Sequence, residues 1–175
     1  YYLTDAVSLA VDSGTPVLTH TTTDVDEVSG VNTPQQLARL ERGYQARQAE
    51  ELIHAGLYLR DPTRFELLGT MEFGTDGMID VNVLLVGHVV LGNDVTIGAN
   101  CTVLDSELGD GVTVNPNSVI EGARVGSDWS IGPFARLRSG TELAARARVG
   151  NFVELTETRM GEGSKANHLA YVGAA

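Results

Sequence analysis

An aliphatic residue recurs every six positions through the second half of the chain, and this repeat limits the possible folds more than any other sequence feature. A period of six matches neither an amphipathic helix, which repeats every 3.6 residues, nor a strand, which repeats every two. Three steps of the repeat are five residues long instead of six. The recurring residues are Ile79, Leu85, Leu91, Ile97, Val103, Leu108, Val114, Ile120, Val125, Ile131, Leu137, Leu143, Val149, Leu155, Met160, Ala166 and Val172.

This period is typical of a parallel β-helix with a triangular cross-section, in which each hexad forms one short strand and one corner. Three hexads, about 18 residues, complete a coil, and coils stack about 4.8 Å apart through backbone hydrogen bonds. The aliphatic residue points inward, and the small or β-branched residue four positions later, such as Val89, Cys101 or Ser118, fits the crowded corner. We therefore predict a mainly β fold, a left-handed parallel β-helix over residues 57–175. A β-sandwich is a poor alternative, because its turn signals come every 8 to 12 residues.

A long helix is predicted before the β-helix. Thr33, Pro34 and Gln36 have the spacing of a capping box, with proline at the first helical position. Gly56 can end the helix, so we expect a helical linker over 34–56.

Residues 1–33 contain less structure. A helical pattern runs from Asp5 to Asp12, and a strand-like run extends from Pro16 to His20. One helix and one strand cannot bury a core of their own. We interpret this segment as a short α/β remnant of a larger domain, and expect the sequence to be part of a longer protein.

The charge balance excludes several classes of partner. The formal net charge is −11, which argues against a nucleic-acid or anionic-membrane surface. Cys101 is the only cysteine, so an intrachain disulfide and a cysteine metal cluster are impossible. No apolar stretch approaches the roughly 18 residues needed to insert into a membrane. These features favour a cytoplasmic location.

Several motifs along the chain resemble one family, the bacterial bifunctional UDP-N-acetylglucosamine pyrophosphorylase/glucosamine-1-phosphate N-acetyltransferase (GlmU). The resemblance covers essentially the whole sequence, in order. The motifs are Tyr2-Leu3-Thr4-Asp5, Glu27-Val28-Ser29-Gly30-Val31-Asn32, Leu59-Arg60-Asp61-Pro62, Ile131-Gly132-Pro133-Phe134-Ala135-Arg136-Leu137-Arg138, Val149-Gly150-Asn151-Phe152-Val153-Glu154 and Gly163-Ser164-Lys165-Ala166-Asn167-His168-Leu169.

The resemblance implies two reactions in the synthesis of UDP-N-acetylglucosamine for peptidoglycan and lipopolysaccharide. The β-helix domain of the family acetylates glucosamine-1-phosphate with acetyl-CoA. The N-terminal uridylyltransferase domain then transfers uridylyl from UTP and uses Mg²⁺. The resemblance also implies a homotrimer, with acetyl-transfer sites between neighbouring β-helices.

The resemblance identifies His168 as the general base of acetyl transfer. A neutral imidazole suits this reaction, because a base must remove a proton as the amine attacks the thioester. From spacing alone, a histidine in a β-helix turn is more often a solvated loop residue. Glu154 could orient the imidazole, although a solvated charge at a strand edge is nearly as good an interpretation.

Three positions correspond to sugar-phosphate contacts of the family, and two of them match its residues. Arg138 is expected to hold phosphate oxygens with its guanidinium group, and Tyr171 to contact the sugar. Without the motif, a surface ion pair for Arg138 and simple packing for Tyr171 are equally good interpretations. Arg136 should also face outward. Thr156 stands where the family has a lysine, and Glu157 follows it, so we expect weaker phosphate binding.

Asn32 matches an asparagine of the family that contacts Mg²⁺ and nucleotide. An amide oxygen can ligate Mg²⁺, usually beside a carboxylate and phosphates. No glycine-rich nucleotide loop or metal-binding aspartate accompanies Asn32 in the sequence, so within this chain we expect it only to help cap the following helix.

The sequence also allows other functions. The chain could be a stand-alone hexapeptide acyltransferase, or a non-catalytic β-helix that serves as an assembly scaffold. A carbonic anhydrase-like metal site is a poor fit, because His88 and His168 lie many coils apart. The final hexad is incomplete and the family continues with further coils that supply most of the acetyl-CoA site. We therefore expect this polypeptide alone to catalyse neither reaction.

Overall fold

The computed structural model describes residues 2–146 and 148–174. The chain forms two compact units, Tyr1–Leu40 and Glu41–Ala175, and the boundary between them falls inside helix α2 (Pro34–His54). No helix in the described residues has both the length and the apolar character needed to cross a membrane.

The first unit contains helix α1 (Leu3–Asp12), the short helix η1 (Asp26–Val28) and the first turns of α2. No residue of α1 is buried. The strand expected from Pro16 to His20 is wrong, since residues 15–24 form no strand. The described part of this unit contains no other strand with which such a segment could exchange ladder hydrogen bonds.

The capping box that was expected at the start of α2 is confirmed. Oε1 of Gln36 accepts hydrogen bonds from the backbone N–H groups of Asn32 (2.8 Å) and Thr33 (3.1 Å). The N–H of Gln36 donates to Oγ1 of Thr33 at 3.2 Å. These bonds satisfy backbone donors that have no partner within the helix.

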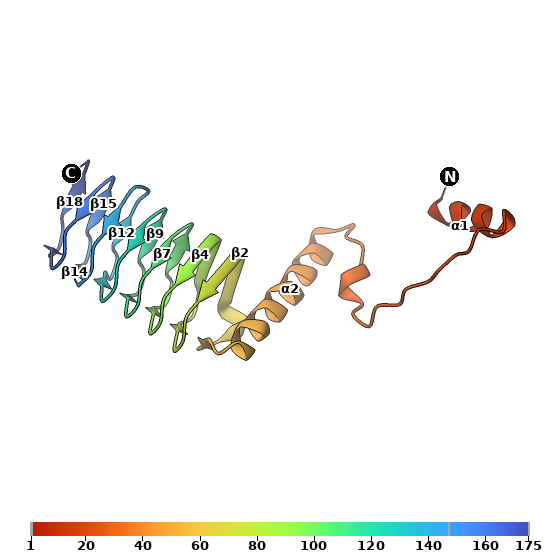
Figure 1. Ribbon diagram of the computed structural model, residues 1–175, viewed down its shortest axis with the longest axis horizontal. Helices are drawn as coiled ribbons and strands as arrows, with labels where there is room; N and C mark the ends of the chain where they lie inside the picture. The colour runs from red at the N-terminus through yellow and green to blue at the C-terminus, as the bar shows by residue number, and fades with distance from the viewer. Residues whose placement is uncertain (1, 147, 175) are drawn as a thin grey trace. The chain divides into compact units, whose positions relative to one another are not determined.

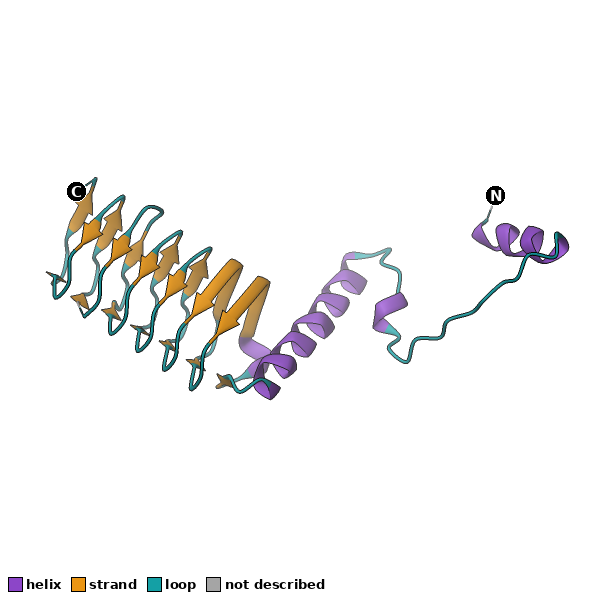
Figure 2. Cartoon of the chain, in the orientation of Figure 1, coloured by secondary structure: helices purple, strands orange, loops and turns teal. Residues whose placement is uncertain are grey.

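The second unit is a parallel β-helix whose coils stack in sequence order (Figures 1 and 2). The predicted parallel β-helix is confirmed. Its elements are β1 (Tyr58–Leu59), η2 (Pro62–Arg64), β2 (Phe65–Phe73), β3 (Met78–Ile79), β4 (Val83–Leu91), β5 (Thr96–Ile97), β6 (Thr102–Leu104), β7 (Glu107–Leu108), β8 (Thr113–Val114), β9 (Val119–Glu121), β10 (Arg124–Val125), β11 (Ser130–Ile131), β12 (Arg136–Leu137), β13 (Glu142–Leu143), β14 (Arg148–Val149), β15 (Glu154–Thr156), β16 (Arg159–Met160), β17 (Lys165–Ala166) and β18 (Tyr171–Gly173).

The strands define three sides of the β-helix. The first side is a sheet in the order β1-β3-β5-β8-β11-β14-β17. The second side contains β6, β9, β12, β15 and β18, and the third contains β7, β10, β13 and β16. The long strands β2 and β4 run round the corner between the second and third sides and join them into one sheet.

The repeating aliphatic residues form the core, as predicted. Each lies in a strand with its side chain inward, and all are buried except Met160 and Val172, which are partly buried. On the second side, Ile120, Leu137 and Leu155 lie opposite one another on successive coils. The core is therefore a set of stacked rows, each of which receives one residue per coil.

The three short steps of the repeat occur at one corner. They join β6 to β7, β9 to β10 and β15 to β16, and each passes from the second to the third side. The chain turns there through residues with positive φ, namely Asp105 (42°), Gly122 (56°) and Glu157 (47°). Because the omitted residue always comes from the same corner, the strands before and after it stay in register.

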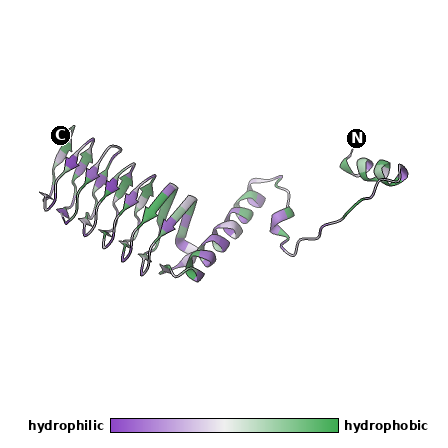
Figure 3. Ribbon diagram, viewed as in Figure 1, coloured by the Kyte–Doolittle hydropathy of each residue, from purple (hydrophilic) through white to green (hydrophobic). Residues whose placement is uncertain are grey.

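The second half of α2 packs against the first coils. Gln45 is only 3% exposed, and its side-chain amide accepts from the N–H of Leu67 (2.9 Å) and donates to its carbonyl (3.1 Å). This amide satisfies both backbone groups of Leu67 in β2, whose strand partner is β4. Ala49 is fully buried in the same core, although most of α2 is hydrophilic (Figure 3). The predicted linker helix therefore also covers a strand edge.

Candidate functional site

The second side brings four of the sequence-predicted site residues, together with Arg136, onto one outward surface. Arg136 in β12 lies opposite Glu154 in β15, which lies opposite Tyr171 in β18. Because side chains alternate along a strand, the inward Leu137 and Leu155 leave Arg136, Arg138, Glu154 and Thr156 facing outward. Residues far apart in sequence thus become neighbours about one coil spacing apart.

Arg138 is paired with Glu154. Nη1 of Arg138 lies 3.3 Å from Oε1 of Glu154, with the two side chains 48% and 36% exposed. The backbone N–H of Arg138 donates to the carbonyl of Leu155 at 2.8 Å, which fixes the start of the side chain on the sheet. A half-exposed pair of this kind contributes little to stability but orients the guanidinium. The guanidinium keeps further N–H groups for an anionic ligand.

Thr156 faces outward in β15, next to the position of Arg138 on the adjacent coil, and lies opposite Gly173. Its carbonyl accepts from Oγ1 of Thr158 (2.7 Å) and from the N–H of Ala174 (3.1 Å). The outward side chain at this position is a neutral hydroxyl group.

His168 lies in the exposed turn between β17 and β18. Three backbone bonds tie the segment around it to the preceding coil. The N–H of Gly150 donates to Ala166 (2.7 Å), that of Leu169 to Asn151 (3.1 Å) and that of Glu154 to Ala170 (2.9 Å). The turn is thus held at the corner between the first and second sides, next to the strand that carries Tyr171.

Gly150 is important for this turn, although no pattern in the sequence predicted this role. A Cβ atom built on Gly150 would overlap the carbonyl oxygen of Asn167, the residue before His168. Only glycine allows the turn to approach the coil below so closely.

The structure does not join Glu154 to His168. The carboxylate of Glu154 pairs with Arg138, and no hydrogen bond from His168 is present among the described residues. Asn32 belongs to the other unit, where its backbone N–H helps to cap α2.

The described residues do not fit a Mg²⁺ site. They contain no group of three or more histidine, cysteine, aspartate or glutamate side chains that could hold a metal ion. Asn32 is thus not accompanied by a carboxylate cluster of the kind that a Mg²⁺ site normally uses.

Two exposed phenylalanines at the corner near His168 were also not predicted to interact. Phe134 and Phe152 lie on successive coils, and their rings stack with centroids 5.1 Å apart and planes inclined by 15°. Both have a φ of 56°, which is unusual for bulky residues. Each also stands two residues before an outward residue of the site, Arg136 and Glu154 respectively.

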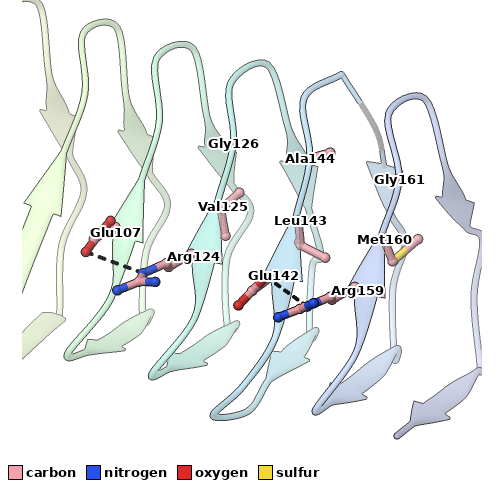
Figure 4. A pocket seen from close by; sticks show the side chains of 10 residues that line it. All are labelled: Glu107, Arg124, Val125, Gly126, Glu142, Leu143, Ala144, Arg159, Met160 and Gly161. Carbon is pink, nitrogen blue, oxygen red and sulfur yellow. Dashed lines mark ion pairs between the residues drawn. The ribbon is translucent and has the colours of Figure 1, made fainter. Parts of the chain in front are cut away.

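A groove of the described residues lies elsewhere, on the third side (Figure 4). It has a volume of about 540 Å³. Its charged side chains neutralise one another in pairs, Arg124 with Glu107 at 3.6 Å and Arg159 with Glu142 at 3.0 Å. None of the sequence-predicted site residues lines this groove. We therefore assign the candidate site to the second side, although it is not a deep cavity.

Comparison with known proteins agrees with the motifs. No family model matches the chain. The chain is 53% identical over all of its 175 residues to the bifunctional protein GlmU of Marinobacter nauticus, and the alignment covers 38% of that protein. The chain thus spans well under half the length of this curated relative.

Two solved structures share the fold. One is AntD, an N-acyltransferase from Bacillus cereus, in complex with dTDP and coenzyme A; its TM-score is 0.57 at 13% identity, over 65% of this chain and 80% of AntD. The other is the acetyltransferase domain of PglB from Neisseria gonorrhoeae, with a TM-score of 0.58 at 17% identity, over 71% of this chain and 63% of that domain. At these identities the similarity concerns the fold alone. The 53% identity over the full chain shows more: this chain is a homologue of GlmU, and it corresponds to a part of that protein that includes a β-helix.

Proposed function

We propose that this chain forms the sugar-phosphate half of an acetyltransferase site, in a GlmU-type protein that transfers acetyl from acetyl-CoA to glucosamine-1-phosphate. The observation that carries the proposal is the outward surface of the second side. It gathers Arg138, Glu154, Thr156 and Tyr171 on adjacent coils, with His168 in the adjoining corner. These side chains supply a cation, a hydroxyl donor and a base in one region.

In the proposed reaction, the amine nitrogen of the sugar attacks the thioester carbonyl. A carbon–nitrogen bond forms, the carbon–sulfur bond breaks, and the thiolate of coenzyme A leaves. His168 accepts the proton released by the amine and can return it to the thiolate. Its exposed turn allows the imidazole to reach a substrate bound on the second side.

Arg138 is proposed to bind the phosphate group, and Tyr171 to hydrogen-bond the sugar. Glu154 holds the guanidinium of Arg138, so its first contribution is to position the phosphate-binding group. To orient His168 as well, the carboxylate would have to leave Arg138. Thr156 can offer a hydroxyl hydrogen bond but no charge.

For the whole protein we propose the remaining properties of GlmU. These are uridylyl transfer from UTP with Mg²⁺, assembly as a homotrimer, and a cytoplasmic role in making the precursor of peptidoglycan and lipopolysaccharide. This chain spans 38% of its curated relative, and its described residues do not fit a Mg²⁺ site. We therefore expect the chain alone to catalyse neither reaction.

A binding experiment tests the sugar-phosphate half directly. Glucosamine-1-phosphate added to the ¹⁵N-labelled chain should shift the amide signals of Arg138, Glu154 and Tyr171, and free glucosamine should shift them much less. Arg138→Gln should weaken binding by roughly tenfold, as expected for a lost charge-assisted contact. The matched control is Arg159→Gln, which removes the same charge on the third side. Equal binding by both variants would refute the assignment.

Two further measurements separate catalysis from scaffolding. Thr156→Lys should restore the family cation and tighten binding of glucosamine-1-phosphate. A chimaera in which this chain replaces the matching part of Marinobacter nauticus GlmU should have acetyltransferase activity that His168→Ala abolishes. An assembled but inactive chimaera, together with no sugar-phosphate binding by the chain, would favour the scaffold interpretation. Two observations favour the scaffold interpretation: the neutral Thr156, and the pairing of Arg138 with Glu154.

A further inference from the structure

Five of the nine cationic side chains of the β-helix are paired with a carboxylate. Arg60 pairs with Asp80 at 3.2 Å and Arg159 with Glu142 at 3.0 Å. Arg124, Arg138 and Arg146 pair with Glu107, Glu154 and Glu162 respectively. Such pairing is expected in a chain with 23 acidic and 12 basic residues. Cations that have no carboxylate partner therefore need an explanation.

Arg64, Arg136, Arg148 and Lys165 are such cations among the described residues, and of these Arg148 and Lys165 are the pair in facing strands. These two lie directly opposite each other on the first side, in β14 and β17. Both are exposed and face outward, since the next residue in each strand, Val149 and Ala166, is buried. Neither has an ion-pair or hydrogen-bond partner for its side chain among the described residues. Glu162, in the adjacent corner, is taken by Arg146.

This arrangement is the reverse of that on the third side. There the outward residues alternate in sign from coil to coil, in the order Glu107, Arg124, Glu142 and Arg159. Opposite charges in register stabilise a sheet, whereas like charges directly opposite destabilise it. Arg148 and Lys165 thus weaken the stacking of coils on the first side, whereas the charges on the third side strengthen it. A bound anion would remove this repulsion.

We propose that Arg148 and Lys165 form an anion site for the phosphate group of a small phosphorylated molecule, separate from the Arg138 surface. Neighbouring parallel strands place the backbone positions of the two residues about 4.8 Å apart. The guanidinium of Arg148 and the ammonium of Lys165 can therefore converge on one phosphate or bridge a diphosphate. The outward residues of the preceding coils, Thr96, Thr113 and Ser130, are polar and uncharged, so no carboxylate in this row competes for the cations. Two sources share this chemistry: a sugar phosphate, and the diphosphate of a nucleotide-type coenzyme.

Inorganic pyrophosphate is the first probe. It is titrated into the ¹⁵N-labelled chain at constant ionic strength, and the amide signals of Arg148 and Lys165 are followed. Saturable shifts are expected at both residues. Arg148→Gln and Lys165→Gln should each raise the dissociation constant by at least about fivefold, the loss expected for one of two charge-assisted contacts.

The matched control is Arg124→Gln, which removes the same charge from a paired arginine on the third side and should leave the dissociation constant unchanged. Circular dichroism and sedimentation of every variant show whether the fold and the oligomeric state are retained. Shifts without saturation, equal weakening by Arg124→Gln, or variants that change the oligomeric state instead of pyrophosphate binding would overturn the proposal.

Glucosamine-1-phosphate and coenzyme A, used separately, distinguish the two sources. Saturable shifts of Arg148 and Lys165 with coenzyme A alone identify the coenzyme diphosphate, and shifts with the sugar phosphate alone identify the sugar. Saturation with neither would refute a functional phosphate site. The proposed sugar-phosphate function is read from different signals, those of Arg138 and Tyr171, so each proposal can fail while the other stands.

Discussion

Leu137 offers a strong test of the connection between the core and the candidate site. Its side chain is fully buried between Ile120 and Leu155 on the neighbouring coils. The residues on either side, Arg136 and Arg138, donate backbone hydrogen bonds to the next coil, both at 2.8 Å. Leu137→Ala would therefore open a cavity directly beneath the surface that carries Arg138.

The expected loss of stability follows from two contributions. The substitution removes three carbon atoms, worth about 0.8 kcal/mol each, or roughly 2.4 kcal/mol in total. The cavity adds to this cost, because hydrogen bonds to coils on both sides prevent the strands from closing around it. Together these give about 3 to 5 kcal/mol, within the range known for buried leucines. The matched control is Leu169→Ala, where the same atoms are 76% exposed and the cost should stay below about 0.5 kcal/mol.

Two assays read this effect. Urea denaturation followed by circular dichroism measures the change in unfolding free energy. Native-state hydrogen exchange at the amides of Arg136 and Arg138 measures local opening, which matters because repeats in a stacked fold interact mainly with their neighbours. A difference of less than about 1 kcal/mol between Leu137→Ala and Leu169→Ala would refute the proposed stacked-row core.

Three further outcomes are expected. Replacing Gln45 by Ala should cost roughly 1 to 3 kcal/mol in urea denaturation, because both backbone groups of Leu67 lose their partner; no measurable change would contradict this role. Burial raises the pKa of the Cys101 thiol above its ordinary value of 9.0, so the thiol should react with disulfide reagents far more slowly in the native chain than in urea. The stability contributed by the buried, neutral thiol should be complete below pH 9 and lost as the pH rises above 9. Equal labelling rates in the native chain and in urea would contradict the burial of Cys101. Arg148→Glu should place a negative charge opposite Lys165 and raise the free energy of unfolding by about 0.2 to 1 kcal/mol, and by less at high salt. A lower free energy of unfolding would contradict the repulsion between Arg148 and Lys165.

Much of the fold could be predicted from local patterns. The six-residue repeat identified each inward position, because a strand that buries one face requires an apolar residue at a fixed spacing. The capping box of Thr33 and Gln36 marked the start of α2, because its bonds join residues three apart. The strand predicted near Pro16 was wrong because strand formation depends on a distant partner and not on local sequence alone. A strand-like composition forms no ladder without a partner strand.

The candidate site was predictable only in part. The motifs selected Arg138, Glu154, Thr156, Tyr171 and His168, but the structure was needed to show that the first four share an outward surface. No pattern in the sequence could show that Glu154 pairs with Arg138, since that choice depends on side-chain geometry across two coils.

The sequence by itself determined the period, and with it the β-helix, because the direction of a side chain follows from its position within each hexad. Only the tertiary structure decided which residues meet. It placed all three short steps at one corner, stacked Phe134 on Phe152, and aligned Arg148 with Lys165. The physical reason is that these contacts join residues about one coil apart. Which residues face each other on successive coils depends on the conformation of every corner between them.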